Sequence, residues 1–322
     1  MTATASAQPA RTTPTPARHA ATPRPGALGH GAGFWVVAFA FWATMAFSAV
    51  PTPLWVLYQH RDGFSTFMIT VAFAAYALGV VVSLFLAGHL SDRLGRRRVL
   101  FPAVLVEIVA AAVFLSSTSL SALITARVIA GLGTGMITAT ATAYLSELHA
   151  TARPDAGRAR SELVATTANM GGLAGGPLVS GLLAQYTHQP LRLPYVAFLA
   201  ALAVSAVGVA LVPETRRPDG ERRPYRPQRV SVPAHARSAF FAACAAALAG
   251  FSVLGLFTSL APSFVAGTLH HPARALAGLV TFLAFGAAAT TQIALARVAV
   301  RHQISTGVTL TAVGLAAVTT AV

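Results

Sequence analysis

The stretch Gly88-His-Leu-Ser-Asp-Arg-Leu-Gly-Arg-Arg-Arg98 places one aspartate and four arginines between two long apolar blocks. Such a concentration is unusual, because only 10% of the chain is charged and only nine residues are acidic. A short charged segment between two blocks of about 20 apolar residues is typical of a loop that joins two membrane-spanning helices. The stretch therefore predicts that the blocks on either side of it cross a membrane.

The rest of the composition extends this interpretation to the whole chain. Of the 322 residues, 55% are hydrophobic, and they lie in long blocks rather than in alternating patterns. Only helices and closed barrels satisfy their backbone groups in lipid, and these blocks are too long and too uniform for barrel strands. The sequence predicts an all-α, polytopic membrane helix bundle. Its nine candidate spans are residues 34–58, 66–88, 99–117, 121–145, 162–186, 194–213, 238–264, 276–296 and 305–322.

The arginines predict the orientation of these spans. With the N-terminus inside, 19 arginines fall on inner segments, three fall on outer loops, and Arg127 lies within the fourth span. Because inner loops of membrane proteins carry an excess of basic residues, we expect a cytoplasmic N-terminus in a bacterial inner membrane. This distribution explains the net charge of +14 without nucleic-acid binding, since the basic loops face anionic lipid.

Polar segments divide the chain into four parts. Residues 1–33 predict a disordered cytoplasmic tail, and residues 34–213 predict a six-helix transmembrane half. The basic, proline-rich residues 214–237 predict a cytoplasmic linker, followed by a partial second half, 238–322, with three helices. Six spans, a basic linker and a second run of spans are the layout of transporters built from two repeated halves.

The opening stretch resembles the signature loop between helices two and three of the major facilitator superfamily. The residues that match are Gly88, Asp92, Arg93, Gly95, Arg96 and Arg97. The resemblance implies a gate that holds the two halves together on the cytoplasmic side. It also implies that Asp92 lies against the start of helix 11, and the residues themselves allow it to pair with Arg93 or Arg96. From glycine's properties, we expect Gly88 to permit close helix approach and Gly95 to permit a tight turn.

Three further segments resemble motifs of the same family in the same order. Residues 126–135, ARVIAGLGTG, resemble the fourth-helix motif with a buried arginine, and VPET at 212–215 resembles the end of helix six. Residues 171–181, GGLAGGPLVSG, resemble the fifth-helix Gly-Pro motif of antiporters. This motif comprises Gly172, Gly176, Pro177 and Gly181. It implies proton-coupled efflux of a small molecule by alternating access.

Two charged residues lie inside predicted spans. Arg127 is about 9 Å from the outer surface and Glu107 is about 12 Å deep, counted at 1.5 Å per helical residue. Charged groups at such depth are paired or face water, and they are often functional. We expect Arg127 either to tune a proton or substrate site or to reach outward on its long stem. Glu107 is either a proton carrier or a hydrogen-bonded structural residue.

Glycine and aromatic patterns predict helix packing. The run Gly131-Leu-Gly-Thr-Gly135 follows no strand, so it indicates helix packing rather than a dinucleotide loop. Pro177 predicts a bend, and the small residues around Gly286 predict a matching surface for the fifth helix. Trp35 and Trp55 are about 30 Å apart along one helix, so we expect both at membrane interfaces. Tyr76, Thr138 and Asn169 are expected to line a central cavity, and Trp42 either lines this cavity or faces lipid or packs against neighbours.

The expected activity follows from these motifs. The main hypothesis is proton-coupled efflux, with a small-molecule substrate, protons and the lipid bilayer as partners, and with a monomeric chain. The alternatives are a proton-coupled sugar or metabolite uptake symporter and a non-transporting membrane sensor or scaffold. We expect no enzymatic activity, no cofactor and no metal, because no nucleophile, phosphate-loop or ligand spacing occurs and Cys244 is the single cysteine. Twelve helices are the family pattern, so we expect that nine spans alone do not transport.

Overall fold

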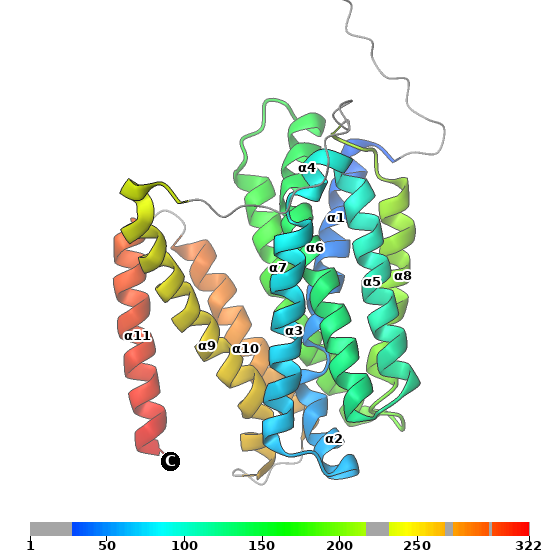
Figure 1. The fold of residues 1–322 in the computed structure, drawn as a ribbon, viewed down its shortest axis with the longest axis vertical. Helices are drawn as coiled ribbons and strands as arrows, with labels where there is room; N and C mark the ends of the chain where they lie inside the picture. The colour runs from blue at the N-terminus through cyan, green and yellow to red at the C-terminus, as the bar shows by residue number, and fades with distance from the viewer. Residues whose placement is uncertain (1–27, 217–231, 268–272, 296–297, 322) are drawn as a thin grey trace, which may run out of the picture.

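The computed structural model describes residues 28–216, 232–267, 273–295 and 298–321. The described chain is helical, which confirms the predicted fold class (Figure 1). The helices are α1 (His30–Ala49), α2 (Trp55–Asp62), α3 (Thr66–Ala87), α4 (Leu90–Leu94), α5 (Arg96–Ser116), α6 (Leu120–Ala152), α7 (Ala159–Tyr186), α8 (Leu193–Leu211), α9 (Arg237–Gly267), α10 (Arg274–Ala294) and α11 (Val300–Ala321), with short 3₁₀ turns η1 (Thr52–Leu54) and η2 (Ala234–Ala236).

A helix occupies each of the nine predicted spans, and within the described residues seven segments are both long and apolar enough to cross a membrane. The segments at α11 and α7 are not among the seven, although the 28 residues of α7 correspond to about 42 Å of helix. Its many glycines and polar residues lower its hydropathy, and the helices around it bury that face. The chain is a multi-pass membrane protein. Most of the predicted tail and linker lies outside the described residues.

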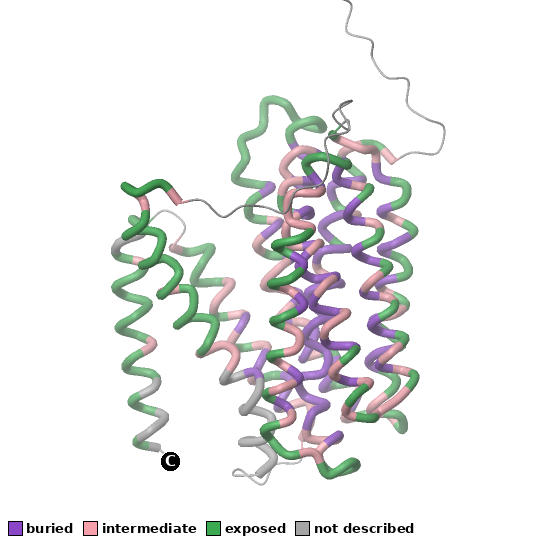
Figure 2. Tube along the Cα trace, viewed as in Figure 1, coloured by how far each residue is buried: buried purple, intermediate pink, exposed green. Residues whose placement is uncertain are grey.

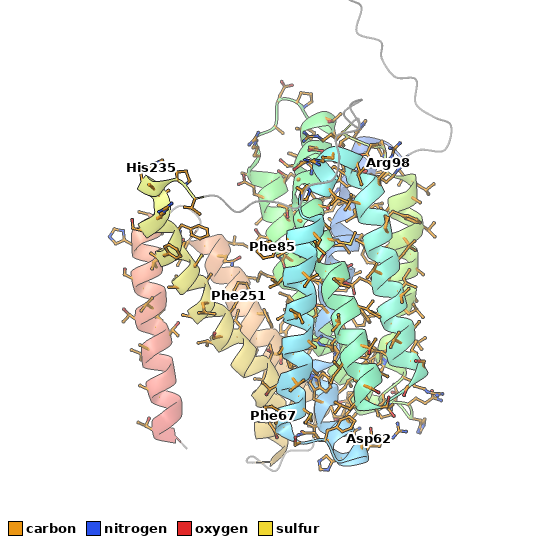
Figure 3. All side chains as sticks on the ribbon, in the orientation of Figure 1. Asp62, Phe67, Phe85, Arg98, His235 and Phe251 are labelled. Carbon is orange, nitrogen blue, oxygen red and sulfur yellow. The ribbon has the colours of Figure 1, made fainter. Side chains whose placement is uncertain are left out.

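The helices α1, α3, α5, α6, α7 and α8 form a bundle with α1 and α6 at its centre (Figure 1). Buried residues are concentrated there, whereas the outer faces of α3 and α8 are exposed (Figure 2). We name the two ends of this bundle after their short helices. Asp62 lies at the α2 end and Arg98 at the α4 end (Figure 3).

The first predicted span is not one continuous helix. α1 ends at Ala49, and Pro51 and Pro53 introduce the turn η1 before α2 begins at Trp55. Proline lacks a backbone N–H and disfavours helical geometry in the residue before it, so two prolines in three residues end α1.

The break at η1 makes one predicted position wrong. Trp55 is 1% exposed and packs against Tyr58 and Phe73, with ring centroids 5.9 and 6.3 Å away. It therefore belongs to the core and not to a membrane interface. Trp35 is 54% exposed near the other end of the segment, as an interfacial residue would be. α1 itself begins at His30, four residues before the predicted start.

Glycines set the closest helix contacts in the bundle. On α3 and α6, Gly79 and Gly131 face each other, and a Cβ at either position would collide with the backbone of the other helix. This contact confirms that the glycine run of α6 serves helix packing. Without a hydrophobic driving force between helices in lipid, such close backbone contact is a main source of association.

The helices α9, α10 and α11 lie beside the bundle, and α10 joins it at the α2 end (Figure 1). There Gly278 packs against the carbonyl of Pro177, and the backbone N–H of Arg274 donates to Gln185 Oε1 at 2.8 Å. The predicted matching surface around Gly286 is wrong, because no atom lies within 4 Å of a Cβ placed there. The contact lies two turns earlier on α10 than predicted, and around Gly286 Phe285 is buried whereas Ala287 and Thr290 are exposed.

Candidate gate and buried polar site

The loop at the α4 end is shaped by Gly95. Its φ of +107° lies in a region that side chains rarely adopt, and a Cβ there would meet Glu214 Oε2 at 2.6 Å. The absence of a side chain lets this carboxylate reach the start of α5. Glu214 Oε1 accepts from the backbone N–H of Arg96 at 2.7 Å, and Oε2 accepts from that of Arg97 at 3.1 Å. The acidic group thus caps the N-terminus of α5 and stabilises the positive end of its dipole.

Arg96 is the buried centre of the loop. Its guanidinium pairs with Glu147 on α6 at 2.8 Å and with Asp92 on α4 at 2.8 Å, and Nη1 donates to Ser91 Oγ at 2.8 Å. The side chain is only 6% exposed. The predicted pairing of Asp92 with Arg96 is therefore present, whereas Arg93 is an exposed residue.

Asp92 has a second arginine partner. Its Oδ1 also accepts from Arg216 Nη1 at 3.2 Å, so the aspartate bridges the loop to the segment that follows α8. The predicted contact with the start of helix 11 stays a prediction. Gly88 ends α3 with ordinary right-handed backbone geometry, so its expected role in close packing also stays a prediction.

Two carboxylates of this cluster were missed by the sequence analysis as site residues. Glu147 accepts from Arg96 and from Thr215 Oγ1 at 2.5 Å, and Tyr144 donates to the carbonyl of Pro213 at 2.7 Å. These bonds attach the VPET segment to α6. The scarcity of acidic residues could have pointed to these carboxylates in the sequence, because Asp92, Glu147 and Glu214 make up a third of the nine acidic residues in the chain.

The buried arginine of α6 lies between α1 and α3. Arg127 is 2% exposed, and it donates to the carbonyl of Ser48 at 2.7 Å and to that of Ala72 at 3.4 Å. Its guanidinium lies over the rings of Tyr76 at 4.3 Å and Phe73 at 5.1 Å. This burial rules out the alternative in which the side chain extends outward to the membrane surface. Two carbonyls and two aromatic faces stabilise the charge in place of a carboxylate.

Glu107 lies in the contact between α5 and α6. It is fully buried, and Thr134 donates to its Oε1 at 2.9 Å. The opposite oxygen, Oε2, is buried with no hydrogen-bond partner among the described residues. A Cβ at Gly133 would meet the carboxyl group at 2.8 Å, so this glycine makes the space that the glutamate occupies. The glutamate is thus hydrogen-bonded, as expected if it is a structural residue, and its alternative role as a proton carrier stays a prediction.

The four predicted cavity-lining residues are partly buried and are distributed over different contacts. Trp42 covers the glycines of α7 and lies 3.4 Å from a Cβ built at Gly175. Tyr76 lies against Arg127, and Thr138 donates to the carbonyl of Thr134 on its own helix at 2.8 Å. Asn169 lies on α7, one turn before Gly172. Their common role as a cavity lining stays a prediction.

The Gly-Pro motif of α7 faces two neighbours. A Cβ at Gly172 would meet Met45 Cβ at 2.5 Å, and one at Gly176 would collide with the carbonyl of Ala46, so this side packs on α1. A Cβ at Gly181 would meet the carbonyl of Arg274 at 2.6 Å, so this side packs on α10. α7 continues without interruption through Pro177. The motif thus joins the bundle to α10.

Comparison with known proteins decides the family. The model of the Major Facilitator Superfamily matches residues 26–322, nearly the whole chain. The chain belongs to the major facilitator superfamily. This is a family of membrane transporters and not of enzymes.

Curated relatives of this superfamily member include named carriers. It is 40% identical over 83 residues to the arabinose-proton symporter of Bacillus subtilis, a match that covers 26% of this chain and 18% of that protein. It is 32% identical over 147 residues to the probable metabolite transport protein CsbC of Bacillus subtilis, covering 44% and 29%. It is 33% identical over 94 residues to the glucose transporter GlcP of Staphylococcus epidermidis, covering 29% and 21%. Each match spans less than a third of the relative's own length.

Proposed function

We propose that this chain serves in secondary transport, as part of a carrier that takes up a sugar or a similar small metabolite together with protons. The support is the similarity to relatives named as arabinose-proton symporter, metabolite transport protein and glucose transporter. Uptake is therefore preferred to the efflux that the fifth-helix motif implied. The Gly-Pro motif that favoured efflux has a packing role between α1 and α10, which any transport direction can use.

Proton-coupled efflux remains the second candidate. It is favoured by one observation, the GGLAGGP segment of α7, which is typical of antiporter branches. The relatives also include an uncharacterized MFS-type transporter of Mycobacterium tuberculosis, 32% identical over 147 residues, whose name indicates no direction.

In the proposed carrier, Glu107 and Arg127 are the proton-coupling pair of the bundle. A carboxyl group with one unpartnered oxygen in a buried site can hold a proton there without leaving a bare charge in lipid surroundings. Arg127 on α6 donates to carbonyls of Ser48 on α1 and Ala72 on α3. A movement of α6 is therefore transmitted to both α1 and α3. In this proposal Glu107 takes up the proton and Arg127 transmits the change.

The orientation and the gate complete the proposal. The arginine distribution favours an orientation with the α4 end in the cytoplasm, together with the N-terminus and the 214–237 linker. In that orientation the cluster around Arg96 is a cytoplasmic gate that connects α4, α5, α6 and the end of α8. The six-helix half 34–213 and the helices from 238 onward would then be the two units that move relative to each other.

A solute-driven proton flux measurement tests the direction. The chain is reconstituted, alone and with helices ten to twelve of the family pattern added back, in liposomes that contain a pH-sensitive dye, and pentoses, hexoses and cationic dyes are added one at a time. Uptake symport predicts that one sugar enters the liposomes together with protons. Efflux predicts that a cationic dye moves in the direction opposite to the protons when a proton gradient is imposed. Thermal stabilisation of the detergent-solubilised chain by the same sugars is an independent binding readout.

Two variants separate binding from coupling. Glu107→Gln keeps the hydrogen bond from Thr134 but removes the titratable group, so solute binding should persist while proton movement is lost. The exposed Asp155→Asn on the loop before α7 is the matched control and should behave as the wild type. Full proton coupling in Glu107→Gln would remove the glutamate from the mechanism, and stabilisation by no sugar would contradict the proposed substrate class.

A further inference from the structure

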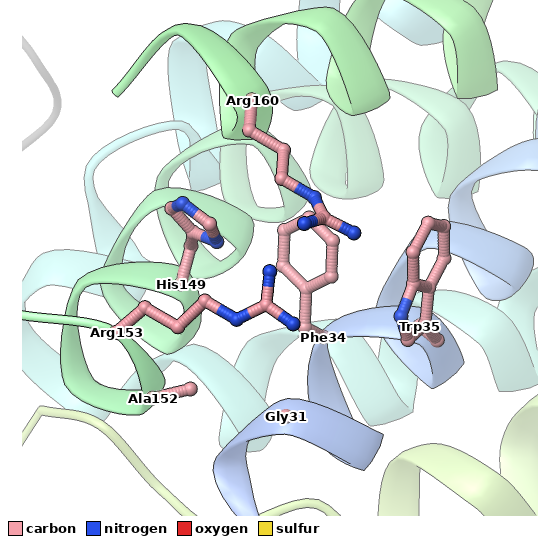
Figure 4. A pocket seen from close by; sticks show the side chains of 7 residues that line it. All are labelled: Gly31, Phe34, Trp35, His149, Ala152, Arg153 and Arg160. Carbon is pink, nitrogen blue, oxygen red and sulfur yellow. The ribbon is translucent and has the colours of Figure 1, made fainter. Parts of the chain in front are cut away.

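A small cavity opens at the α4 end between three helix termini. It lies between the start of α1, the end of α6 and the start of α7, has a volume of about 30 Å³ and is open on one side to the surroundings. Neither the gate cluster nor the buried Arg127 site includes its lining. The side chains and backbone that matter for its chemistry belong to Gly31, Phe34, Trp35, His149, Arg153 and Arg160 (Figure 4).

The cavity concentrates positive charge. Figure 4 shows the guanidinium groups of Arg153 and Arg160 extending toward each other beside the ring of Phe34. No carboxylate lines the cavity, and neither arginine forms an ion pair with an acidic side chain in the part of the chain that the structure describes. Two like charges that converge without a counter-charge form a site that an anion stabilises.

A buried histidine nitrogen adds an unsatisfied group. His149 is 5% exposed and its ring lies against Phe34, with centroids 5.5 Å apart. Its Nε2 is buried without a hydrogen-bond partner among the described residues. Buried polar atoms nearly always have a partner, so an orphaned ring nitrogen beside an open cavity points to a ligand atom that completes it.

The start of α1 contributes backbone donors. Gly31 is the second residue of this helix, and its N-cap residue Gly29 provides no side-chain hydrogen bond. The first N–H groups of a helix have no internal partners and favour anions, here in addition to two arginines and a histidine. Since Gly31 carries no side chain, a bulky anionic group can approach this backbone closely.

We propose that this cavity binds a phosphate group, held by Arg153, Arg160 and His149 at the start of α1. The phosphate has two possible sources of the same chemistry, the headgroup of an anionic membrane lipid and inorganic phosphate from the aqueous phase. Trp35 next to the cavity is half-exposed, as tryptophans at lipid headgroups are, so the binding of lipid is measured first.

Native mass spectrometry of the detergent-solubilised full chain measures the binding. The probes are phosphatidylglycerol, phosphatidylcholine and inorganic phosphate, each added separately at matched concentrations. Retention of phosphatidylglycerol about tenfold or more above that of phosphatidylcholine supports the lipid source. A preference of this size is expected for one or two additional charge-assisted hydrogen bonds. Binding of inorganic phosphate in place of this lipid preference supports the aqueous source.

Matched variants link the binding to the cavity. Arg153→Gln/Arg160→Gln should abolish the preference, whereas Arg98→Gln/Arg158→Gln removes the same charge from exposed positions at the same end and should retain it. His149→Phe keeps an aromatic ring against Phe34, removes the donor and should weaken retention severalfold. Equal retention of all three probes by the wild type, or an unchanged preference in Arg153→Gln/Arg160→Gln, would overturn the proposal.

Discussion

The carboxylate of Glu214 caps the helix that begins at Arg96, although 118 positions separate the two residues in the chain. The bond of 2.7 Å joins the end of the sixth span to the start of the third. The guanidinium of the same Arg96 continues the connection to α4 and α6 through Asp92 and Glu147. One short segment after α8 is thus attached to three neighbouring helices, which makes this cluster the main polar connection at the α4 end.

Loss of the Glu214 cap should destabilise the bundle. In Glu214→Ala the first N–H groups of α5 lose their acceptor, so we expect the free energy of unfolding to fall by about 1–3 kcal/mol. Glu214→Gln retains one acceptor and should cost less. Thermal unfolding in detergent measures both, with Asp155→Asn as a control for the loss of a negative charge. Equal stability of Glu214→Ala and the control would show that the cap is dispensable.

Arg96 and Asp92 should contribute unequally. Arg96 is almost fully buried, and its removal leaves Glu147 without its arginine partner, so Arg96→Gln should lower stability by about 2 kcal/mol or more. Asp92 is 52% exposed, and its pairs are screened by solvent, so Asp92→Asn should cost about 1 kcal/mol or less. Denaturant titration of both variants measures the order, and a larger cost for Asp92→Asn would contradict it. Under the gate proposal, Asp92→Asn should still reduce transport strongly.

Two glycines of α10 provide an internal comparison. In Gly278→Ala the new methyl group collides with the carbonyl of Pro177, so we expect a loss of about 1–3 kcal/mol and weaker attachment of α10 to α7. In Gly286→Ala the methyl group meets no neighbour, and the higher helix propensity of alanine makes the change neutral or favourable by up to about 1 kcal/mol. Melting temperatures of the two variants should therefore move in different directions. A shared response would refute the packing assignment of Gly278.

The buried Thr134–Glu107 bond should also matter for stability. Thr134→Val keeps the shape of the side chain but leaves both oxygens of Glu107 without a partner among the described residues, at a cost of about 1–3 kcal/mol. Thr138→Val is the matched control, because Thr138 donates only to a carbonyl of its own helix. Unfolding measurements should rank the Thr134 variant as clearly less stable than the control.

Thiol labelling tests the proposed orientation. With Cys244→Ser as the background, Asp155→Cys at the α4 end and Gln189→Cys at the α2 end each introduce one exposed thiol. A membrane-impermeant reagent applied to intact cells should label Gln189→Cys and should label Asp155→Cys only after cell lysis. The opposite result would reverse the orientation.

Much of the fold could be predicted from the sequence, because lipid imposes strong and local constraints. Span length, the helical class and the loop between 88 and 98 depend on hydropathy and charge in consecutive residues. The positive-φ turn at Gly95 and the glycine packing on α6 and α7 were also predictable, since glycine is the residue with the least steric restriction. The pairing of Asp92 with Arg96 could be predicted because the two residues lie one helical turn apart.

The sequence by itself determined that this chain is a helical membrane protein, and its motifs indicated the major facilitator superfamily. Only the tertiary structure decided which distant residues meet. Glu214 with Arg96, Glu147 with Thr215 and Gly278 with Pro177 depend on how helices pack, not on spacing along the chain. The same holds for Trp55, which the turn at Pro51 and Pro53 directs into the core. Hydropathy is a sum over neighbours in sequence, whereas a capping carboxylate or a glycine contact is specified by neighbours in space.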